Sequence, residues 1–303
     1  MSQAASSIRS TTRDCLQIIC TLLALTGALT ACGGEADVPA TPAERSVPET
    51  IVAFGYEAYD ELLHTYVDEN GGVDYAGLHS NRGDLDAFIL SFQTLRADDL
   101  DSWSSSDQVA FWINAYNAIT LQRILDHYPI EKGGLISGIR YPANSIRQIP
   151  GVWTKLETPM IGKTLTLDAI EHEILRVDFT EPRIHTAIVC AAVSCPPLRA
   201  EAFRGDRLEA QLADQSRRFL AGATGLRIDH RKKRVEVSSI FDWFGEDFVG
   251  VYNIDSTITG QGTEKGAVLE FVSRHVNDTD AQFLRTEDYS VAYLDYDWSL
   301  NEQ

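Results

Sequence analysis

Large apolar side chains recur at helical spacing along the first part of the chain. Residues 51–67 and 84–96 each carry such a pattern, which predicts two amphipathic helices. Residues 107–128 are apolar on nearly every face, and a helix with that pattern is buried on most sides. Serines and Asp107 stand at its start and Pro129 follows it, as is typical of helix boundaries. We therefore predict a long, buried helix here.

The second half of the chain mixes helical with alternating or short apolar patterns. Helices are predicted over residues 166–179, 206–221 and 264–275, and strands or hairpins over residues 152–167, 184–190, 227–240 and 289–301. Because these elements do not alternate regularly as strand and helix, the α+β class is favoured over α/β. We predict a single globular α+β domain in which the buried central helix packs on a mainly antiparallel sheet.

A short apolar stretch near the N-terminus predicts a targeting segment. Two arginines precede CLQIICTLLALTGAL, residues 15–29, which is too short to span a bilayer. The tetrapeptide LTAC, residues 29–32, resembles a bacterial lipobox. We therefore predict that residues 1–31 are a lipoprotein signal peptide and that Cys32 is acylated. The alternative is an ordinary secretory signal with a chance cysteine.

The residues after this cysteine predict how the protein is held. Residues 32–50 are rich in Gly, Pro, Ala and charge, so they are expected to form a flexible tether. Residues 51–303 form the predicted domain. Gly33 follows the lipobox cysteine where an aspartate would favour retention at the inner membrane. We therefore expect an outer-membrane lipoprotein that faces the periplasm and meets the membrane through its lipid anchor.

Charge and cysteine usage narrow the range of partners. The chain carries 26 basic and 44 acidic side chains, with a formal net charge of −18. Such a protein repels nucleic acid, so we exclude nucleic acid as a partner. Once the signal peptide and Cys32 are set aside, only Cys190 and Cys195 remain. A disulfide between them is a real alternative, because the predicted compartment is oxidising.

Two asparagines interrupt the apolar pattern of the predicted central helix. Asn114 and Asn117 are three residues apart and therefore share one face. A buried amide without a partner costs about 1–3 kcal/mol, so both must form hydrogen bonds. They either tie down loop backbone or bind substrate, and neither can act as an acid or a base.

The predicted helix 166–179 carries a second group of polar residues, with Thr166 as its expected N-cap. At 100° per residue, Glu171 falls inside the apolar stripe of this helix, and His172 falls outside it, between Asp168 and Arg176. A carboxylate on a buried face needs a charge or a hydrogen-bond partner. Glu171 is either part of a structural ion pair or a functional carboxylate, and it is a better candidate than His172.

The segment IHTAIVCAAVSCPPL, residues 184–198, combines a histidine with both cysteines. If residues 184–190 form a strand, His185 and Cys190 point to opposite faces. Cys195 then lies in a loop that two prolines stiffen, where side chains are usually presented to solvent. Cys195 is thus the better nucleophile candidate and Cys190 the better core residue. A disulfide, a zinc site and two structural thiols are the alternatives, although CxxxxC is wider than the usual zinc spacing.

Five motifs occur together in a recognisable order. They are FWINAYNAIT, LTLDAIEHEILR, PRIHTAIVCAAVSCPPL, VSSIFDWFGEDF and YLDYDWSLN. Together they resemble domain-of-unknown-function family 547 (DUF547) from about residue 50 to the end. The resemblance implies no agreed activity, but it places Asn114, Asn117, Glu171, His172, His185, Cys190 and Cys195 in one recurring pattern. In plants and animals the domain resembles an appendage of signalling or scaffold proteins.

These observations lead to one functional hypothesis and one alternative. We expect Asn114, Asn117, Glu171, His185 and Cys195 to converge on one cleft, with His185 or His172 as the base that generates a Cys195 thiolate. The hypothesis is a cell-envelope thiol hydrolase or acyltransferase, with no cofactor and no metal ligands assigned. The alternative is a non-catalytic envelope module that binds a peptide or a glycan and carries a Cys190–Cys195 disulfide.

Overall fold

A computed structural model describes residues 54–252, 258 and 261–303 of the chain, and residues 50–303 form one compact unit. The predicted signal peptide, Cys32 and the tether lie outside the described residues. Within the described ranges, no helix has both the length and the apolar character needed to cross a bilayer.

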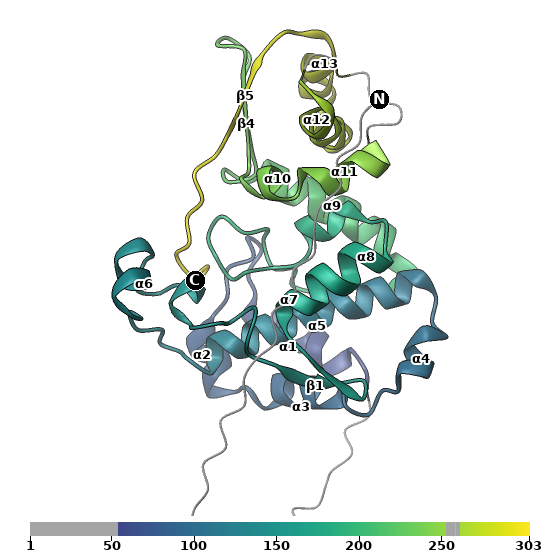
Figure 1. The fold of residues 1–303 in the computed structure, drawn as a ribbon, viewed down its shortest axis with the longest axis vertical. Helices are drawn as coiled ribbons and strands as arrows, with labels where there is room; N and C mark the ends of the chain where they lie inside the picture. The colour runs from purple at the N-terminus through teal and green to yellow at the C-terminus, as the bar shows by residue number, and fades with distance from the viewer. Residues whose placement is uncertain (1–53, 253–257, 259–260) are drawn as a thin grey trace, which may run out of the picture. The chain divides into compact units, whose positions relative to one another are not determined.

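The elements of the first half are mostly helical (Figure 1). They are α1 Glu57–Tyr66, α2 Tyr75–Ser80, α3 Gly83–Ser91, α4 Ala97–Asp101, α5 Ser105–Leu125, α6 Leu135–Arg140, the 3₁₀ helix η1 Ile146–Gln148, β1 Thr158–Met160 and β2 Lys163–Leu165. The predicted hairpin within residues 152–167 is confirmed, because β1 and β2 pair in antiparallel fashion.

The second half adds short helices and the main sheet. Its elements are α7 Leu167–Ala169, the π-helix η2 Ile170–Leu175, α8 Arg176–Asp178, the 3₁₀ helices η3 Pro182–Thr186 and η4 Gly205–Arg207, α9 Leu208–Ala221, β3 Leu226–Asp229, β4 Arg234–Val237, α10 Ile240–Trp243, α11 Gly245–Tyr252, α12 Thr263–His275, α13 Asp278–Thr286 and β5 Ser290–Tyr293. The mixture of helices with small sheets confirms the α+β class.

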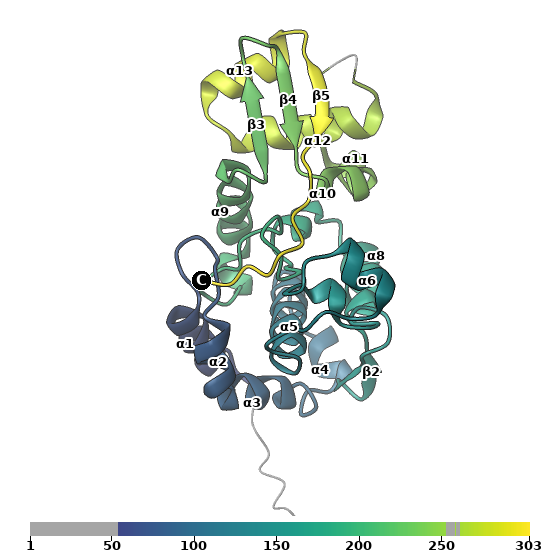
Figure 2. The same ribbon diagram turned by 90° about the vertical axis from the view of Figure 1, so that its left-hand side faces the viewer.

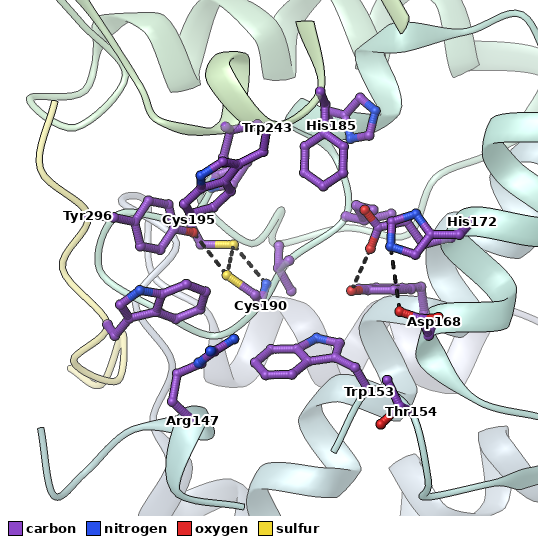
Figure 3. Close-up of a pocket in the computed structure, with 18 residues that line it drawn as sticks. Arg147, Trp153, Thr154, Asp168, His172, His185, Cys190, Cys195, Trp243 and Tyr296 are labelled. Carbon is purple, nitrogen blue, oxygen red and sulfur yellow. Dashed lines mark hydrogen bonds and ion pairs between the residues drawn. The ribbon is translucent and has the colours of Figure 1, made fainter. Parts of the chain in front are cut away.

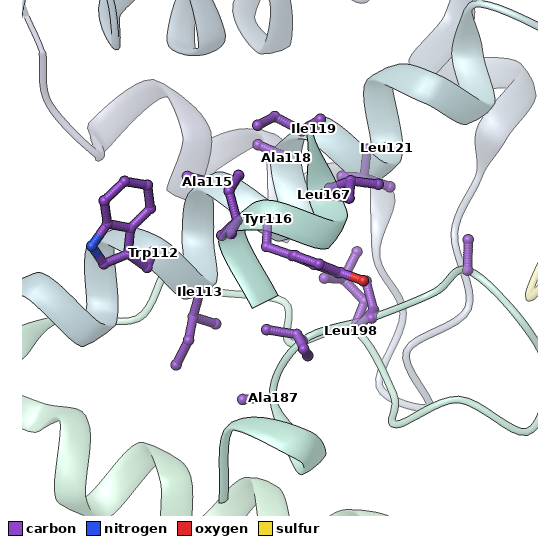
Figure 4. Packing of buried hydrophobic residues seen from close by; sticks show 14 of the residues in the cluster. Trp112, Ile113, Ala115, Tyr116, Ala118, Ile119, Leu121, Leu167, Ala187 and Leu198 are labelled. Atoms are coloured by element: carbon purple, nitrogen blue, oxygen red, sulfur yellow. The ribbon is translucent and has the colours of Figure 1, made fainter. Parts of the chain in front are cut away.

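Helix α5 is the centre of the larger hydrophobic cluster (Figure 4). The Ser104 hydroxyl caps it by accepting a hydrogen bond from the Asp107 backbone N–H at 3.1 Å. Its side chains are buried on every face from Val109 to Leu121. Its main neighbours are α3, η2, η4 and α9, which are helical. The expected packing of this helix directly on a sheet is therefore corrected, because helices cover it.

A smaller hydrophobic cluster surrounds the three-stranded sheet (Figure 2). Strand β4 is central, antiparallel to β3 and parallel to β5, so the sheet is mixed. The β3–β4 hairpin turns at residues 230–233, within the hairpin predicted over residues 227–240. Helices α12 and α13 lie behind the strands in Figure 2, and Val235 and Val237 of β4 share a hydrophobic cluster with α12.

The predicted helix 166–179 is present but is not a regular α-helix. Thr166 caps it as expected, because its hydroxyl accepts from the Ala169 N–H at 3.1 Å. The middle part, Ile170–Leu175, is a π-helix. A spacing of 100° per residue therefore does not hold there, although Glu171 is buried as predicted.

The strand predicted over residues 184–190 is wrong. Pro182 starts a 3₁₀ helix that ends at Thr186, and the following residues form irregular backbone. The run from Ile184 to Val189 is buried throughout. A short apolar run that is buried on all sides does not reveal its secondary structure by periodicity.

The C-terminal strand is shorter than predicted and continues as an extended tail. In Figures 1 and 2 this yellow segment leaves β5 and returns toward the helices around α5. The backbone N–H of Val193 donates to the Ser299 carbonyl at 2.8 Å, and Ala192 forms an isolated bridge with Leu300. The tail is thereby fixed against the loop that carries Cys195.

Candidate functional site

A cavity of about 350 Å³ collects most of the predicted site residues (Figure 3). Its walls come from η2, η3, the loop 188–196, α10 with Phe244, the loop around Arg147, and the C-terminal tail. Glu171, His172, His185, Cys190 and Cys195 all line it. The structure therefore brings these five side chains to one place.

The two cysteines form a contacting pair of free thiols. Their Sγ atoms lie 2.8 Å apart and are joined by a hydrogen bond. The Cys190 backbone N–H also donates to Cys195 Sγ at 2.7 Å, and Cys190 Sγ lies 3.0 Å from Tyr296 Oη. We call Cys190, Cys195 and Tyr296 the thiol wall. The disulfide alternative stays a prediction, because the two sulfurs are free in this structure but face each other.

The exposure of the two thiols is the reverse of the prediction. Cys195 is buried with 7% of its surface exposed, whereas Cys190 is intermediate. Ala191 has a left-handed backbone with φ of 56°, a conformation that a residue with a side chain rarely adopts. This turn folds the loop back, so that the Cys195 N–H donates to the Ala192 carbonyl and its sulfur faces Cys190 rather than solvent.

The contacts within the thiol wall shift the pKa values of its three members in different directions. Burial by itself raises the pKa of Cys190, but hydrogen bonds from Cys195 and Tyr296 outweigh it and place that pKa below the usual thiol value. Burial and the adjacent Cys190 raise the pKa of Cys195 well above its usual value. Burial and the two thiols likewise raise the pKa of Tyr296, which keeps its hydroxyl protonated as a donor. The pKa directions therefore favour Cys190 over Cys195 as the more acidic thiol of the pair.

His185 belongs to a separate cluster on another side of the cavity. Its Nε2 lies 2.7 Å from Asp247 Oδ2, and its ring stacks on Phe244 with centroids 4.2 Å apart. Arg176 donates to both oxygens of Asp247 at 2.6 and 2.9 Å. Burial raises the pKa of Asp247, but the hydrogen bonds from His185 and Arg176 outweigh it and hold that pKa far below the usual range. We call His185, Asp247 and Arg176 the imidazole wall.

The expected pairing of a thiol with a histidine is not formed. Among the described residues, no hydrogen bond links either sulfur to an imidazole, and His185 is committed to Asp247. His172 Nδ1 accepts from Arg176 Nη1 at 3.0 Å, and its Nε2 faces Asp168 at 3.6 Å. The prediction that His172 lies between Asp168 and Arg176 is confirmed.

Glu171 is the carboxylate closest to the interior of the cavity. It is 8% exposed and accepts a hydrogen bond from Tyr116 Oη at 3.0 Å. Burial and Glu171 raise the pKa of Tyr116 well above its usual value, so the phenol stays protonated and donates. The predicted need of this buried carboxylate for a partner is thus met by a hydroxyl from α5.

The two asparagines lie outside the lining of the cavity. Asn117 donates to the Ala187 carbonyl at 3.0 Å and accepts from the Val189 N–H at 2.9 Å. Asn114 makes the same pair of bonds with the carbonyl and N–H of Phe203. Both amides are saturated by loop backbone, so the expected convergence of all five residues on one cleft is corrected. Their role in substrate binding stays a prediction.

Several lining residues were not singled out from the sequence. Tyr116, Arg147, Tyr296 and Trp298 line the cavity, and Asp247 supports His185 from behind. Asp247 and the two C-terminal aromatics do fall within the motifs FDWFGEDF and YLDYDWSLN. The polar and aromatic residues of those two motifs were thus the available sequence signal for these positions. No local pattern, however, shows that they lie near the thiols.

The donor set does not form a metal site in the described part of the chain, where no group of three or more His, Cys, Asp or Glu is placed to hold an ion. The thiol pair thus lacks the third and fourth ligands that a structural zinc needs.

A family model matches the central part of the chain. Residues 100–220 match DUF547, which is described as a protein of unknown function. This match supports the DUF547 family. No curated protein and no solved structure matches the chain. The matched DUF547 segment contains Glu171, His185 and both thiols, whereas Asp247 and Tyr296 lie beyond it.

Proposed function

We propose that this protein is a thiol-dependent hydrolase or acyltransferase in which Cys190 is the attacking sulfur. The observation that carries the proposal is the thiol wall, where two hydrogen bonds lower the pKa of Cys190 at the edge of a cavity. The thiolate is the nucleophilic form of cysteine. The carboxylate of Glu171 lines the same cavity, so a base is available for a second step.

The reaction has two halves. The Cys190 thiolate bonds to an acyl carbon, and the bond from that carbon to the leaving group breaks. The leaving group departs with the electron pair and takes up one proton, which leaves a thioester. Water or another acceptor then attacks the thioester and gives its proton to Glu171, and Cys190 leaves as a thiolate.

The other predicted catalytic residues take supporting parts in this proposal. Once Cys190 loses its proton, the thiol of Cys195 is close enough to donate to it, because the two sulfurs lie 2.8 Å apart. His185 and His172 are tied to Asp247 and Arg176, and they hold the opposite side of the cavity in place. This differs from the expected mechanism, in which a histidine activates Cys195.

Alkylation by iodoacetamide tests which sulfur is activated. At about pH 6.5, well below the ordinary thiol pKa of about 8.5, the wild-type protein should be labelled at Cys190. Cys195→Ser keeps a hydroxyl donor and should still be labelled, whereas Cys190→Ser should not. Hydrolysis of p-nitrophenyl acetate should follow the same order. Labelling of Cys190→Ser at the wild-type rate would assign the nucleophile to Cys195.

Thiol–disulfide exchange is a second candidate, favoured by the 2.8 Å separation of the two sulfurs. In that reaction Cys190 attacks a disulfide, one thiolate leaves, and Cys195 displaces the second. Oxidised glutathione distinguishes the candidates. An exchange enzyme would lose its turnover in Cys195→Ser and accumulate the mixed disulfide, whereas an acyl-transfer enzyme would keep its ester hydrolysis.

We further propose that the protein is anchored at the cell envelope through acylated Cys32. This rests on the sequence alone, since residues 1–53 lie outside the described structure. Labelled fatty acid should enter the wild-type protein, and Cys32→Ser should leave the membrane fraction with an unchanged melting temperature. Retention of Cys32→Ser on membranes in high salt would contradict the anchor.

A further inference from the structure

Arg147 is a cation at the edge of the cavity, and no carboxylate of the described residues pairs with it. Its guanidinium carbon lies 4.6 Å from the ring centre of Tyr141, 4.9 Å from that of Trp298 and 5.4 Å from that of Trp153. Its Nη2 donates to Tyr141 Oη at 2.6 Å. Three aromatic rings therefore fix the orientation of this side chain.

Two other half-buried arginines of the protein are neutralised. Arg176 pairs with Glu246 and Asp247, and Arg183 pairs with Glu181 and Glu209. Within the described ranges, Arg147 has no ion pair, although a partly buried charge normally has one. The guanidinium thus keeps donors available for a group that enters the cavity.

The placement of Arg147 gives the cavity two ends of opposite charge. In Figure 3 its guanidinium points in the direction of the thiol pair, and His172 and Asp168 lie at another side of the same cavity. Glu171 precedes His172 in η2 and also lines the cavity. An anionic ligand is attracted by Arg147 and repelled by the two carboxylates, so it can enter in one orientation only.

We infer that Arg147 binds a carboxylate group of the substrate. This inference rests on the proposed function, and it names the substrate class as a carboxylate-bearing acyl compound of small-molecule size. The guanidinium fork presents paired donors that match a carboxylate. Trp153 and Trp298 flank the fork and provide apolar surface for the ligand body. A cavity of about 350 Å³ suits a small ligand.

Benzoate and uncharged benzamide are suitable probes, because they differ in charge but hardly in shape. Binding is followed through tryptophan fluorescence, since Trp153 and Trp298 contact the Arg147 guanidinium. Benzoate should bind the wild-type protein at least about tenfold more tightly than benzamide, as expected for a charge-assisted pair. Equal binding of the two probes would overturn the inference.

Variants separate the fork from a general effect of charge. Arg147→Gln should lose at least about tenfold in benzoate affinity, and Arg147→Lys should retain part of it, because lysine keeps the charge but not the fork. Arg140→Gln is the matched control, because exposed Arg140 also lies over Tyr141, at 5.5 Å, but does not line the cavity. Its affinity should not change. Should Arg147→Gln unfold, Arg147→Lys decides, and wild-type affinity there would contradict recognition by the fork.

Two further arms separate this inference from related ideas. Cys190→Ser should bind benzoate normally, so the carboxylate site can be tested even if acyl transfer fails. Conversely, suppose that Arg147→Gln hydrolyses esters as fast as the wild type, and that the wild type shows no preference for anionic esters. That result would overturn the carboxylate site at Arg147 but would not contradict the proposed acyl transfer. Inorganic phosphate should compete weakly with benzoate, and competition at equal strength would overturn the assignment to carboxylates.

Discussion

The thiol wall and the imidazole wall border the same cavity but are stabilised in different ways. In the imidazole wall, Asp247 forms an ion pair with Arg176 at 2.6 Å and contacts His185 Nε2 at 2.7 Å. In the thiol wall, Cys190 is surrounded by an S–H and an O–H and meets no opposite charge within hydrogen-bond distance. Charge therefore fixes the geometry of one wall, and neutral donors set the acidity of the other. Among the described residues, the hydrogen bonds that lower the pKa of Cys190 come from a thiol and a phenol and not from a histidine.

The largest loss of stability is expected in the segment that connects the two walls. Asn117 holds the backbone of Ala187 and Val189, between His185 and Cys190. Asn117→Ala leaves a buried carbonyl and a buried N–H without partners, which should lower the free energy of unfolding by about 2–5 kcal/mol. Urea denaturation measures the loss, and exposed Asn70→Ala, the control, should stay within about 0.5 kcal/mol. A loss below 1 kcal/mol for Asn117→Ala would show that water replaces the amide.

The contribution of the imidazole wall to the free energy of unfolding should depend on pH. Asp247→Asn removes the charge that His185 and Arg176 share, at a cost of about 1–3 kcal/mol at pH 7. Because folding lowers the pKa of Asp247, its contribution is fully present above the unfolded pKa of about 3.9 and declines as the pH falls below it.

Thermal melts between pH 3 and pH 7 should therefore show the wild type and Asp247→Asn converging toward the acid end. Glu246→Gln is the control, because Glu246 contacts only the exposed edge of Arg176, with 69% of its side chain exposed. A constant difference across this pH range would contradict the ion-pair explanation.

The thiol wall should respond to the loss of a single hydroxyl. Tyr296→Phe removes a hydrogen bond to Cys190 Sγ that lowers the pKa of this thiol, so the pKa of Cys190 should rise. The rate of iodoacetamide labelling as a function of pH measures this shift. Tyr293→Phe, on β5, is the control and should leave the profile unchanged. An unchanged profile in Tyr296→Phe would show that Cys195 alone sets the acidity of Cys190.

The smallest effect is expected at His172, which borders the cavity from a half-exposed position. Its nearest carboxylate oxygen, on Asp168, is 3.6 Å away. Exposed pairs of this kind contribute about 0–1 kcal/mol, so His172→Gln should change the free energy of unfolding by less than 1 kcal/mol. A larger loss, measured by urea denaturation, would place His172 within the imidazole wall.

The features that could be predicted from the sequence are those that depend on neighbouring residues. The caps at Ser104 and Thr166, the buried helix α5 and the β3–β4 hairpin each follow from a short pattern. Glu171 was identified because a carboxylate interrupts an apolar stripe. These inferences need no knowledge of the tertiary structure.

The parts of the site that could not be predicted depend on contacts across long sequence separations. Asp247 is 62 residues from His185, and Tyr296 is 106 residues from Cys190. The supposed strand 184–190 failed for the same reason, because Asn117 of α5 satisfies backbone groups that a neighbouring strand was expected to satisfy. No local pattern shows that a side chain will replace a strand partner.

The fixing of the C-terminal tail against the thiol loop has a consequence during synthesis. Cys190 leaves the ribosome 106 residues before Tyr296, which at about 5–20 residues per second is an interval of about 5–20 seconds. During that interval the thiol lacks its phenol donor, and the loop lacks the backbone bonds to Ser299 that fix it. The nascent chain therefore carries two cysteines without these contacts, and the hydrogen bond from Tyr296 that helps to lower the pKa of Cys190 arises only when the last segment docks.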